Sequence, residues 1–194
     1  MRRHGEYLKV LFDRAAPYGM LPAGIYCESE LEDRETFPLL HLQVDFDEQR
    51  PHYKKQLEAG VPLGNGYCIR MFPVWFSFRG NGAVHLAMGK SASILGRYFG
   101  DTALLDIARE QLYWVSGKNP FCQSLIYGEG HRYSQQYAHF PGEMTGEMPV
   151  GIETLEDEDV PYWPTGNNAT YKEVWLTPAG RWLAILADLY ASDT

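Results

Sequence analysis

The sequence of 194 residues has few cysteines, and its basic residues are not gathered into a patch. Its three cysteines, Cys27, Cys68 and Cys122, match no zinc-binding spacing and cannot all pair, so we expect free or semi-buried thiols. With a net charge of −8, the chain has no Lys and Arg cluster beyond Arg2–Arg3. Because phosphate contacts need clustered positive charge, we expect no nucleic-acid partner. No metal or cofactor is predicted either.

Long apolar runs are also lacking. No run approaches the roughly 20 residues that a membrane helix requires, so no membrane span is predicted. Residues 1–20 do not contain the apolar segment of a signal peptide. The chain opens directly on a helical pattern, and we therefore expect it to begin inside a fold.

Aromatic residues are abundant. They make up 14% of the chain, with five Trp and 13 Tyr, within a hydrophobic content of 45% that is sufficient for a packed core. Trp and Tyr carry a large apolar face with one polar tip. That chemistry suits the flat face of a sugar ring and an ordinary core equally well, so composition alone leaves both interpretations open.

Helical periodicity appears in separate parts of the chain. The first helix carries Leu8, Leu11, Phe12 and Ala15 and is ended by Pro17. The last helix is expected to begin near residues 177–178, with Thr as the cap and Pro at the first helical position. Its predicted buried stripe consists of Trp182, Leu183, Leu186 and Leu189.

Between these two helices, the spacing predicts an αα-hairpin. One helix runs from about Gly82 to Phe99 and is rich in small residues that allow close packing. Gly100 is placed to end it, and Asp101 is placed to cap the following helix, which Gly117 closes. The tight junction makes the two helices antiparallel neighbours.

Residues 20–80 and 118–172 are interrupted by many Pro and Gly residues and are predicted to be long ordered loops, with a small strand pair in the first. The predicted fold class is therefore all-α with long loops. Loops longer than about 15 residues are uncommon in compact domains and are usually functional. Because so few helices accompany them, these loops indicate the functional face of a larger structure.

Three blocks in order resemble glycoside hydrolase family 9. Residues 80–121 end in Gly117-Lys118-Asn119-Pro120, similar to the Gly-x-Asn-Pro turn of that family's penultimate hairpin. Residues 123–130 look like the turn that leads to the family's histidine-bearing loop. The segment 171–174, Tyr-Lys-Glu-Val, looks like the family's Asn-Glu-Val segment, whose glutamate is the general acid.

The resemblance implies an incomplete (α/α)6 toroid, with residues 1–194 as the C-terminal portion of the catalytic domain. It also implies hydrolysis of a β-linked glucan or related oligosaccharide with inversion at the anomeric carbon, in a cleft across the loop ends. Family members are usually secreted or periplasmic. Partners expected on this basis are a carbohydrate substrate and either a missing N-terminal segment or a second copy that covers exposed helices.

An inverting mechanism requires one protonated and one ionised carboxyl group, about 6.5–9.5 Å apart. Glu173 matches the family's general acid, and apolar surroundings made by Tyr171, Trp175 and Trp163 would favour its protonated form. The family's base comes from aspartates near the start of the full domain. Asp45 and Asp47 have the wrong position and neighbours for this role, so the base is expected outside this chain.

Candidate substrate-binding residues lie in the loops. His139 matches part of the family's His-x-Arg motif, but no arginine follows two residues later, and Arg132 is its candidate replacement. For His139, a sugar-binding role and a purely structural role are both open. Candidates for sugar stacking are Tyr137, Tyr162, Trp163, Tyr171 and Trp175. Each taken singly is expected to be a core residue, but because they fall in loops, one or two of them are expected to line a cleft.

The acidic residues 153–159 lack the alternation and glycine of an EF-hand, so a solvated loop is expected there in place of a calcium site. Two alternatives to a hydrolase remain open. The chain could be a non-catalytic carbohydrate-binding remnant of such a domain, or a helical module that mediates association.

Overall fold

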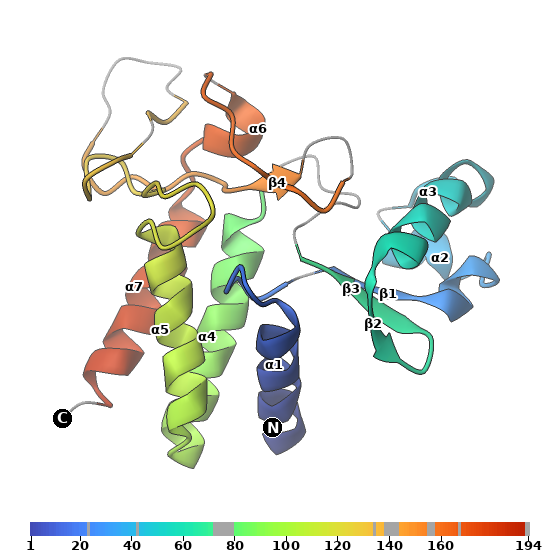
Figure 1. The fold of residues 1–194 in the computed structure, drawn as a ribbon, viewed down its shortest axis with the longest axis horizontal. Helices are drawn as coiled ribbons and strands as arrows, with labels where there is room; N and C mark the ends of the chain where they lie inside the picture. The colour runs from blue at the N-terminus through green and yellow to red at the C-terminus, as the bar shows by residue number, and fades with distance from the viewer. Residues whose placement is uncertain are drawn as a thin grey trace.

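The computed structural model describes residues 1–22, 24–41, 43–71, 80–133, 135–137, 144–154, 158–166 and 168–192. Helices α1 (Arg2–Arg14), α4 (Gly82–Phe99), α5 (Thr102–Val115) and α7 (Leu176–Tyr190) lie side by side (Figure 1). Helix α4 is central and contacts the other three. The main core lies between these helices, and its largest buried members include Leu8, Leu11, Leu86, Leu104 and Trp114.

The predicted hairpin is confirmed in its caps. Gly100 adopts the left-handed conformation, with φ of 65°, at the end of α4. The side chain of Asp101 accepts a hydrogen bond of 3.3 Å from the backbone N–H of Leu104, which caps α5. Local sequence therefore fixes where both helices end and begin.

Helix α7 is present and begins near the predicted position, but the predicted Thr cap is absent and the predicted buried face is partly wrong. It begins at Leu176, without a side-chain cap, and Leu183 and Leu186 are 60% and 43% exposed. The face packed on α4 instead carries Ile185, Asp188 and Leu189, which are buried. A period of 3.6 residues identifies a helix but cannot distinguish two neighbouring faces when both contain leucine.

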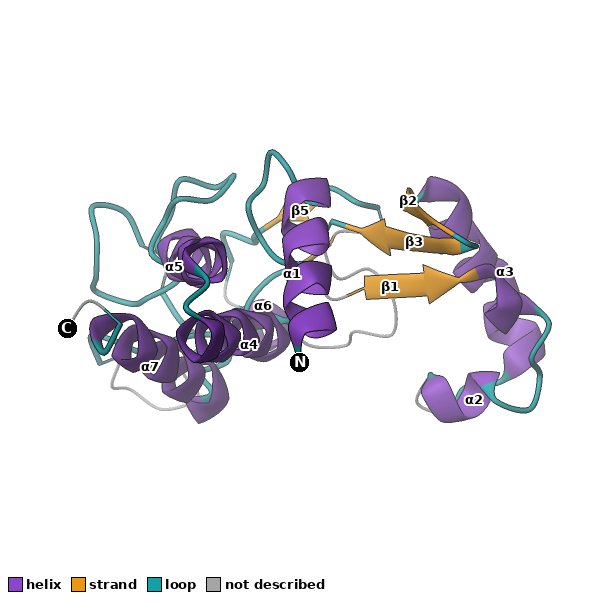
Figure 2. Ribbon diagram, turned by 90° about the horizontal axis from the view of Figure 1, so that it is seen from below, coloured by secondary structure: helices purple, strands orange, loops and turns teal. Residues whose placement is uncertain are grey.

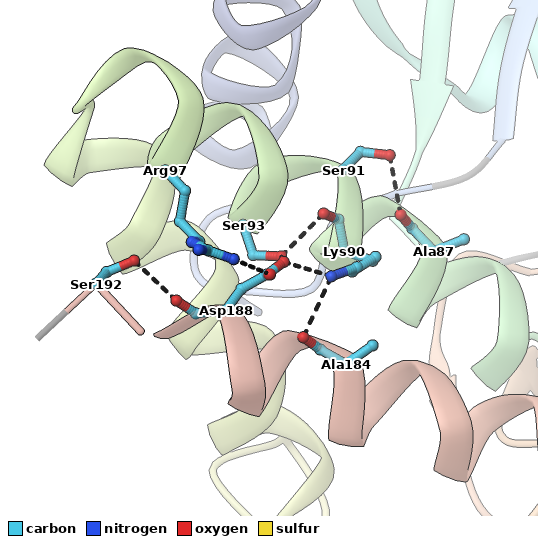
Figure 3. A network of polar contacts seen from close by, with 8 residues as sticks. All are labelled: Ala87, Lys90, Ser91, Ser93, Arg97, Ala184, Asp188 and Ser192. Atoms are coloured by element: carbon cyan, nitrogen blue, oxygen red, sulfur yellow. Dashed lines mark hydrogen bonds and ion pairs between the residues drawn. The ribbon is translucent and has the colours of Figure 1, made fainter. Parts of the chain in front are cut away.

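A buried polar network holds α7 against α4 (Figure 3). The carboxylate of Asp188 is bonded by Lys90 Nζ, by Ser93 Oγ at 2.6 Å and by Arg97 Nη1 at 2.8 Å. Burial alone would raise the pKa of Asp188, but the hydrogen bonds from Lys90, Ser93 and Arg97 outweigh burial and hold that pKa below its usual range. This network explains why a charged residue occupies the inner face of α7.

Residues 24–70 form a smaller unit that corrects the all-α prediction. Strands β1 (Gly24–Cys27), β2 (Val61–Gly64) and β3 (Tyr67–Arg70) make an antiparallel sheet in the order β1-β3-β2, with helix α3 (Phe46–Ala59) packed against it (Figure 2). Short helices η1 (Glu28–Leu31) and α2 (Phe37–Leu40) connect β1 to α3. The molecule is thus mostly helical with a small sheet.

Sequence reasoning missed α3 because Pro51 lies inside it. The helix is stabilised at its start by Asp45, whose side chain accepts a hydrogen bond of 2.9 Å from Glu48 N. Its inner face places Phe46 and Tyr53 beside Phe37, with ring centroids 5.2 Å apart in both pairs. These contacts join α3 to a residue outside the helix and outweigh the local effect of the proline.

Two expectations from the sequence, on membrane spans and on the cysteines, can be compared with the described residues. Within these ranges, none of the helices has both the length and the apolar character of a membrane span. Cys27, Cys68 and Cys122 are all free thiols, as predicted. Their exposure differs: Cys68 is buried and Cys122 is exposed.

Three glycines allow the start of α4 to pass directly against the chain that leads into the loop region. Gly82 N donates to Val150 O, and a Cβ on Gly80 would lie 2.1 Å from the carbonyl oxygen of Gly151. Gly151 itself has φ of 107°. Only glycine fits at these positions, because a side chain would collide with backbone or force a strained conformation. The contact fixes residues 150–152 against the start of α4.

Candidate active site

The candidate site is built on residues 168–175, which lie above α4 and lead into the upper end of α7 in Figure 1. This segment contains the short helix α6 (Ala169–Lys172), which is capped by Asn168 through a hydrogen bond of 2.8 Å to Thr170 N. Gly80 N donates to Thr170 O at 2.7 Å. The glycine contact at the start of α4 therefore also positions α6.

Neighbouring backbone segments hold both sides of the segment that bears Glu173. On one side, Tyr137 N donates to Lys172 O at 2.9 Å. On the other side, Val150 N donates to Glu173 O at 2.8 Å, and Gly151 N donates to Tyr171 O at 3.1 Å. The backbone around Glu173 is therefore fixed by residues that are distant in sequence. The predicted residue Tyr137 belongs to this frame through its backbone.

The side chain of Glu173 is half-buried and contacts Trp175. The indole Nε1 of Trp175 donates to Glu173 Oε2 at 2.9 Å. Trp175 itself is 40% exposed. Residues 173 and 175 project from extended backbone, where alternate side chains share a side, which explains their contact. The indole N–H thereby orients one carboxylate oxygen, so Trp175 contacts Glu173 through its polar N–H and not only as the apolar surroundings that the sequence predicted.

Three of the predicted stacking residues form an aromatic cluster. The ring centroids of Tyr162 and Tyr171 are 5.5 Å apart, and those of Trp163 and Tyr171 are 6.4 Å apart, both in edge-to-face geometry. Tyr171 is buried, whereas Tyr162 and Trp163 are half-buried. Tyr171 is thus a core residue that supports Tyr162 and Trp163, and Trp163 retains accessible surface.

A groove of about 380 Å³ lies along Trp163, and the candidate residue Arg132 is part of its wall. Arg132 is exposed, and the described residues contain no ion-pair partner for its guanidinium group. Glu173 is not among the described lining residues, although Lys172, its neighbour in the chain, contacts two of them. The described residues that line the groove are Phe121, Gln123, Arg132, Trp163, Pro164 and Thr165.

Sequence reasoning missed Lys172, which is only 2% exposed. Its Nζ donates to the carbonyl oxygen of Thr165 at 3.2 Å and lies 5.6 Å from the ring centroid of Trp163. Burial lowers the pKa of Lys172. A lysine is most often a surface residue, so nothing local in the sequence indicates this burial.

Two predicted features fall wholly or partly outside the described residues. His139 lies outside them, so its role stays a prediction. Of the acidic residues 153–159, Glu158 pairs with Lys55 at 2.9 Å, and Asp159 accepts from Met71 N at 2.8 Å. Within the part of the chain that the structure describes, no group of three or more His, Cys, Asp and Glu side chains could hold a metal ion.

The chain has a partial structural similarity to a family 9 cellulase. Two crystal structures of the cellulase Cel9M of C. cellulolyticum match it with a TM-score of 0.48. In the complex with cellobiose, the match has 18% identity over 81% of this chain, and in the other structure 15% over 94%. The chain spans only 38% and 43% of those proteins, respectively. No protein-family model and no curated protein sequence matches the chain.

Proposed function

We propose that this chain carries the acid side of a glycoside hydrolase site that cleaves a β-linked glucan or oligosaccharide with inversion. In this proposal, Glu173 is the general acid and the catalytic base lies outside this chain. Glu173 donates its proton to the glycosidic oxygen as the bond to the anomeric carbon breaks. A water molecule, activated by the base, attacks the opposite face of the sugar.

One observation carries the proposal: the segment that bears Glu173 contacts the wall of the aromatic groove. The carboxylate is oriented by the indole N–H of Trp175. The two preceding residues, Tyr171 and Lys172, contact Trp163 in the groove wall. An indole face and a planar guanidinium group suit a sugar ring with its hydroxyl groups. Trp163 and Arg132 therefore have the chemistry of a sugar-binding wall.

Replacing Glu173 by glutamine in the complete gene product tests the acid role. The amide has nearly the same shape but cannot supply the proton, so turnover should fall at least about a hundredfold while oligosaccharide binding stays nearly intact. Turnover would be measured on a panel of soluble β-glucan oligosaccharides, with proton NMR of the first anomer released. Glu58→Gln, on the exposed face of α3, is the matched control.

The outcomes separate the candidate functions. Unchanged turnover in Glu173→Gln would remove Glu173 from the mechanism, and release of the β-anomer would exclude inversion. Binding of oligosaccharides without hydrolysis by the wild-type protein would support the non-catalytic carbohydrate-binding alternative. Neither binding nor hydrolysis on the whole panel would reject both carbohydrate functions.

Exposed apolar side chains favour a second candidate, a module for association. The outer face of α7 carries Leu176, Leu183, Leu186 and Tyr190, all exposed and within one stripe of the helix. A second copy of the chain that covered this stripe would bury them. Sedimentation equilibrium tests this candidate, and a monomer at all concentrations would reject self-association.

A further inference from the structure

Burial of the Lys172 ammonium group is energetically costly, and contacts within the site offset part of this cost. Transfer of an ammonium group out of water is costly unless other groups replace its hydration. The part of the chain that the structure describes provides no carboxylate within ion-pair distance of Lys172. The ammonium group is stabilised instead by the Thr165 carbonyl at 3.2 Å and by the Trp163 ring at 5.6 Å.

Both of these partners line the groove that also contains Arg132. The indole of Trp163 has two contacts with this segment, an edge-to-face contact with Tyr171 and a contact with the ammonium group of Lys172. The hydrogen bond to the Thr165 carbonyl fixes the backbone that follows Trp163. One buried cation therefore restrains both the ring and the chain of one groove wall.

The backbone of Lys172 is anchored independently of its side chain. Its N–H donates to Asn168 O at 2.8 Å, and its carbonyl accepts from Tyr137 N at 2.9 Å. A change of side chain at position 172 leaves these contacts, and hence the backbone of Glu173, in place. The side chain can therefore be varied without moving the candidate acid.

We propose that Lys172 is a positioning residue, whose ammonium group fixes residues 163–165 as a sugar-binding wall of this groove. This inference rests on the proposed function and assigns the affinity of the groove, rather than the chemical step, to Lys172. An apolar side chain of similar volume in a buried position is often as stable as a charged one. A purely structural role for Lys172 and a positioning role therefore predict different results.

The decisive test needs no ligand. The indole ¹H–¹⁵N resonance of Trp163, assigned by its loss in Trp163→Phe, would be compared between the wild type and Lys172→Met. We expect the resonance to shift and broaden in Lys172→Met, to remain near its wild-type position in Lys172→Arg, and not to move in the control Lys54→Met. An unchanged resonance in Lys172→Met would overturn the proposal.

Kinetics then tests the consequence for the groove. On a soluble β-glucan oligosaccharide, Lys172→Met should raise KM about fivefold while kcat stays nearly constant, because the ring that binds sugar is displaced and the acid is not. A fall in kcat at constant KM would contradict the assignment to affinity. Lys172→Gln keeps a donor for Thr165 without the charge, and it replaces Lys172→Met in both assays if the methionine variant does not fold.

The two proposals fail in distinguishable ways. If the wild-type protein neither binds nor cleaves β-glucans, the proposed function is rejected, and the indole resonance still decides whether Lys172 positions Trp163. If Glu173→Gln abolishes turnover but the Trp163 resonance is unchanged in Lys172→Met, the hydrolase proposal stands and the positioning role is rejected.

Discussion

Replacing Asp188 by alanine measures how strongly the packing of α7 on α4 depends on one buried carboxylate. Asp188 is 7% exposed and accepts hydrogen bonds from Lys90, Ser93 and Arg97. Removal of one partner from a fully buried ion pair costs about 3–5 kcal/mol. Here Lys90 and Arg97 keep side-chain exposures of 28% and 44%, so both can regain water after the change.

Because Lys90 and Arg97 can regain water, the expected loss of unfolding free energy is only about 2–3 kcal/mol. Part of this loss comes from packing, because alanine leaves the space of the carboxylate unfilled. For a domain of this size, the corresponding drop in Tm is about 5–10 °C. Urea unfolding followed by circular dichroism would report the change as a lower midpoint with an unchanged m value.

The loss should also depend on pH. Because the pKa of Asp188 is lowered in the folded protein, its ionised form contributes stability that is present above the ordinary aspartate pKa of about 4. That contribution is lost as the pH falls through the lowered folded pKa. The difference in stability between wild type and Asp188→Ala should therefore be full at neutral pH and smaller at strongly acidic pH.

Asp106→Ala is the matched control, since Asp106 pairs with Arg109 on the surface and its side chain is 68% exposed. This control should change stability by less than about 0.5 kcal/mol. The reasoning is refuted if Asp188→Ala costs no more than Asp106→Ala, or if its cost is the same in acid as at neutral pH.

Two further predictions concern a backbone contact and a surface. Gly151→Ala should destabilise the protein by about 2 kcal/mol or more, because φ of 107° is strained for alanine and Gly82 N lies 2.5 Å from the added Cβ. Equal urea midpoints for Gly151→Ala and wild type would contradict this prediction. If a second copy covers α7, Leu183→Glu should shift sedimentation equilibrium toward monomer. Leu39→Glu, at a site on α2 that is 73% exposed compared with 60% for Leu183, should not. Identical association in both variants would remove α7 from the interface.

Local sequence determined the elements whose signals are short-range. Gly100 and Asp101 specify the junction between α4 and α5, because one tolerates the left-handed conformation and the other caps a helix through its own side chain. Leu8 and Leu11 likewise identify the buried face of α1. In each case, the interaction that decides the structure lies within one or two helical turns.

Long-range contacts decided the small sheet and helix α3. Residues 20–80 are predicted to be ordered loops with a small strand pair, because many Pro and Gly residues interrupt them. Phe46 and Tyr53 of α3 nevertheless share a core with Phe37. Strand pairing of Gly24 with Arg70 joins residues far apart in the sequence. Periodicity within a short window contains no information about such partners.

The candidate site divides in the same way. The sequence alone indicated the candidate residues and their order, including Glu173, Trp163 and Arg132, because a motif shows which functional groups the chain contains. Tertiary structure decided which of them meet: Arg132 and Trp163 share a groove, Tyr171 is buried beneath it, and Lys172 is held inside the wall. The physical reason is that burial and contact depend on how loops are clamped across the ends of α4 and α7, which no stretch of neighbouring residues encodes by itself.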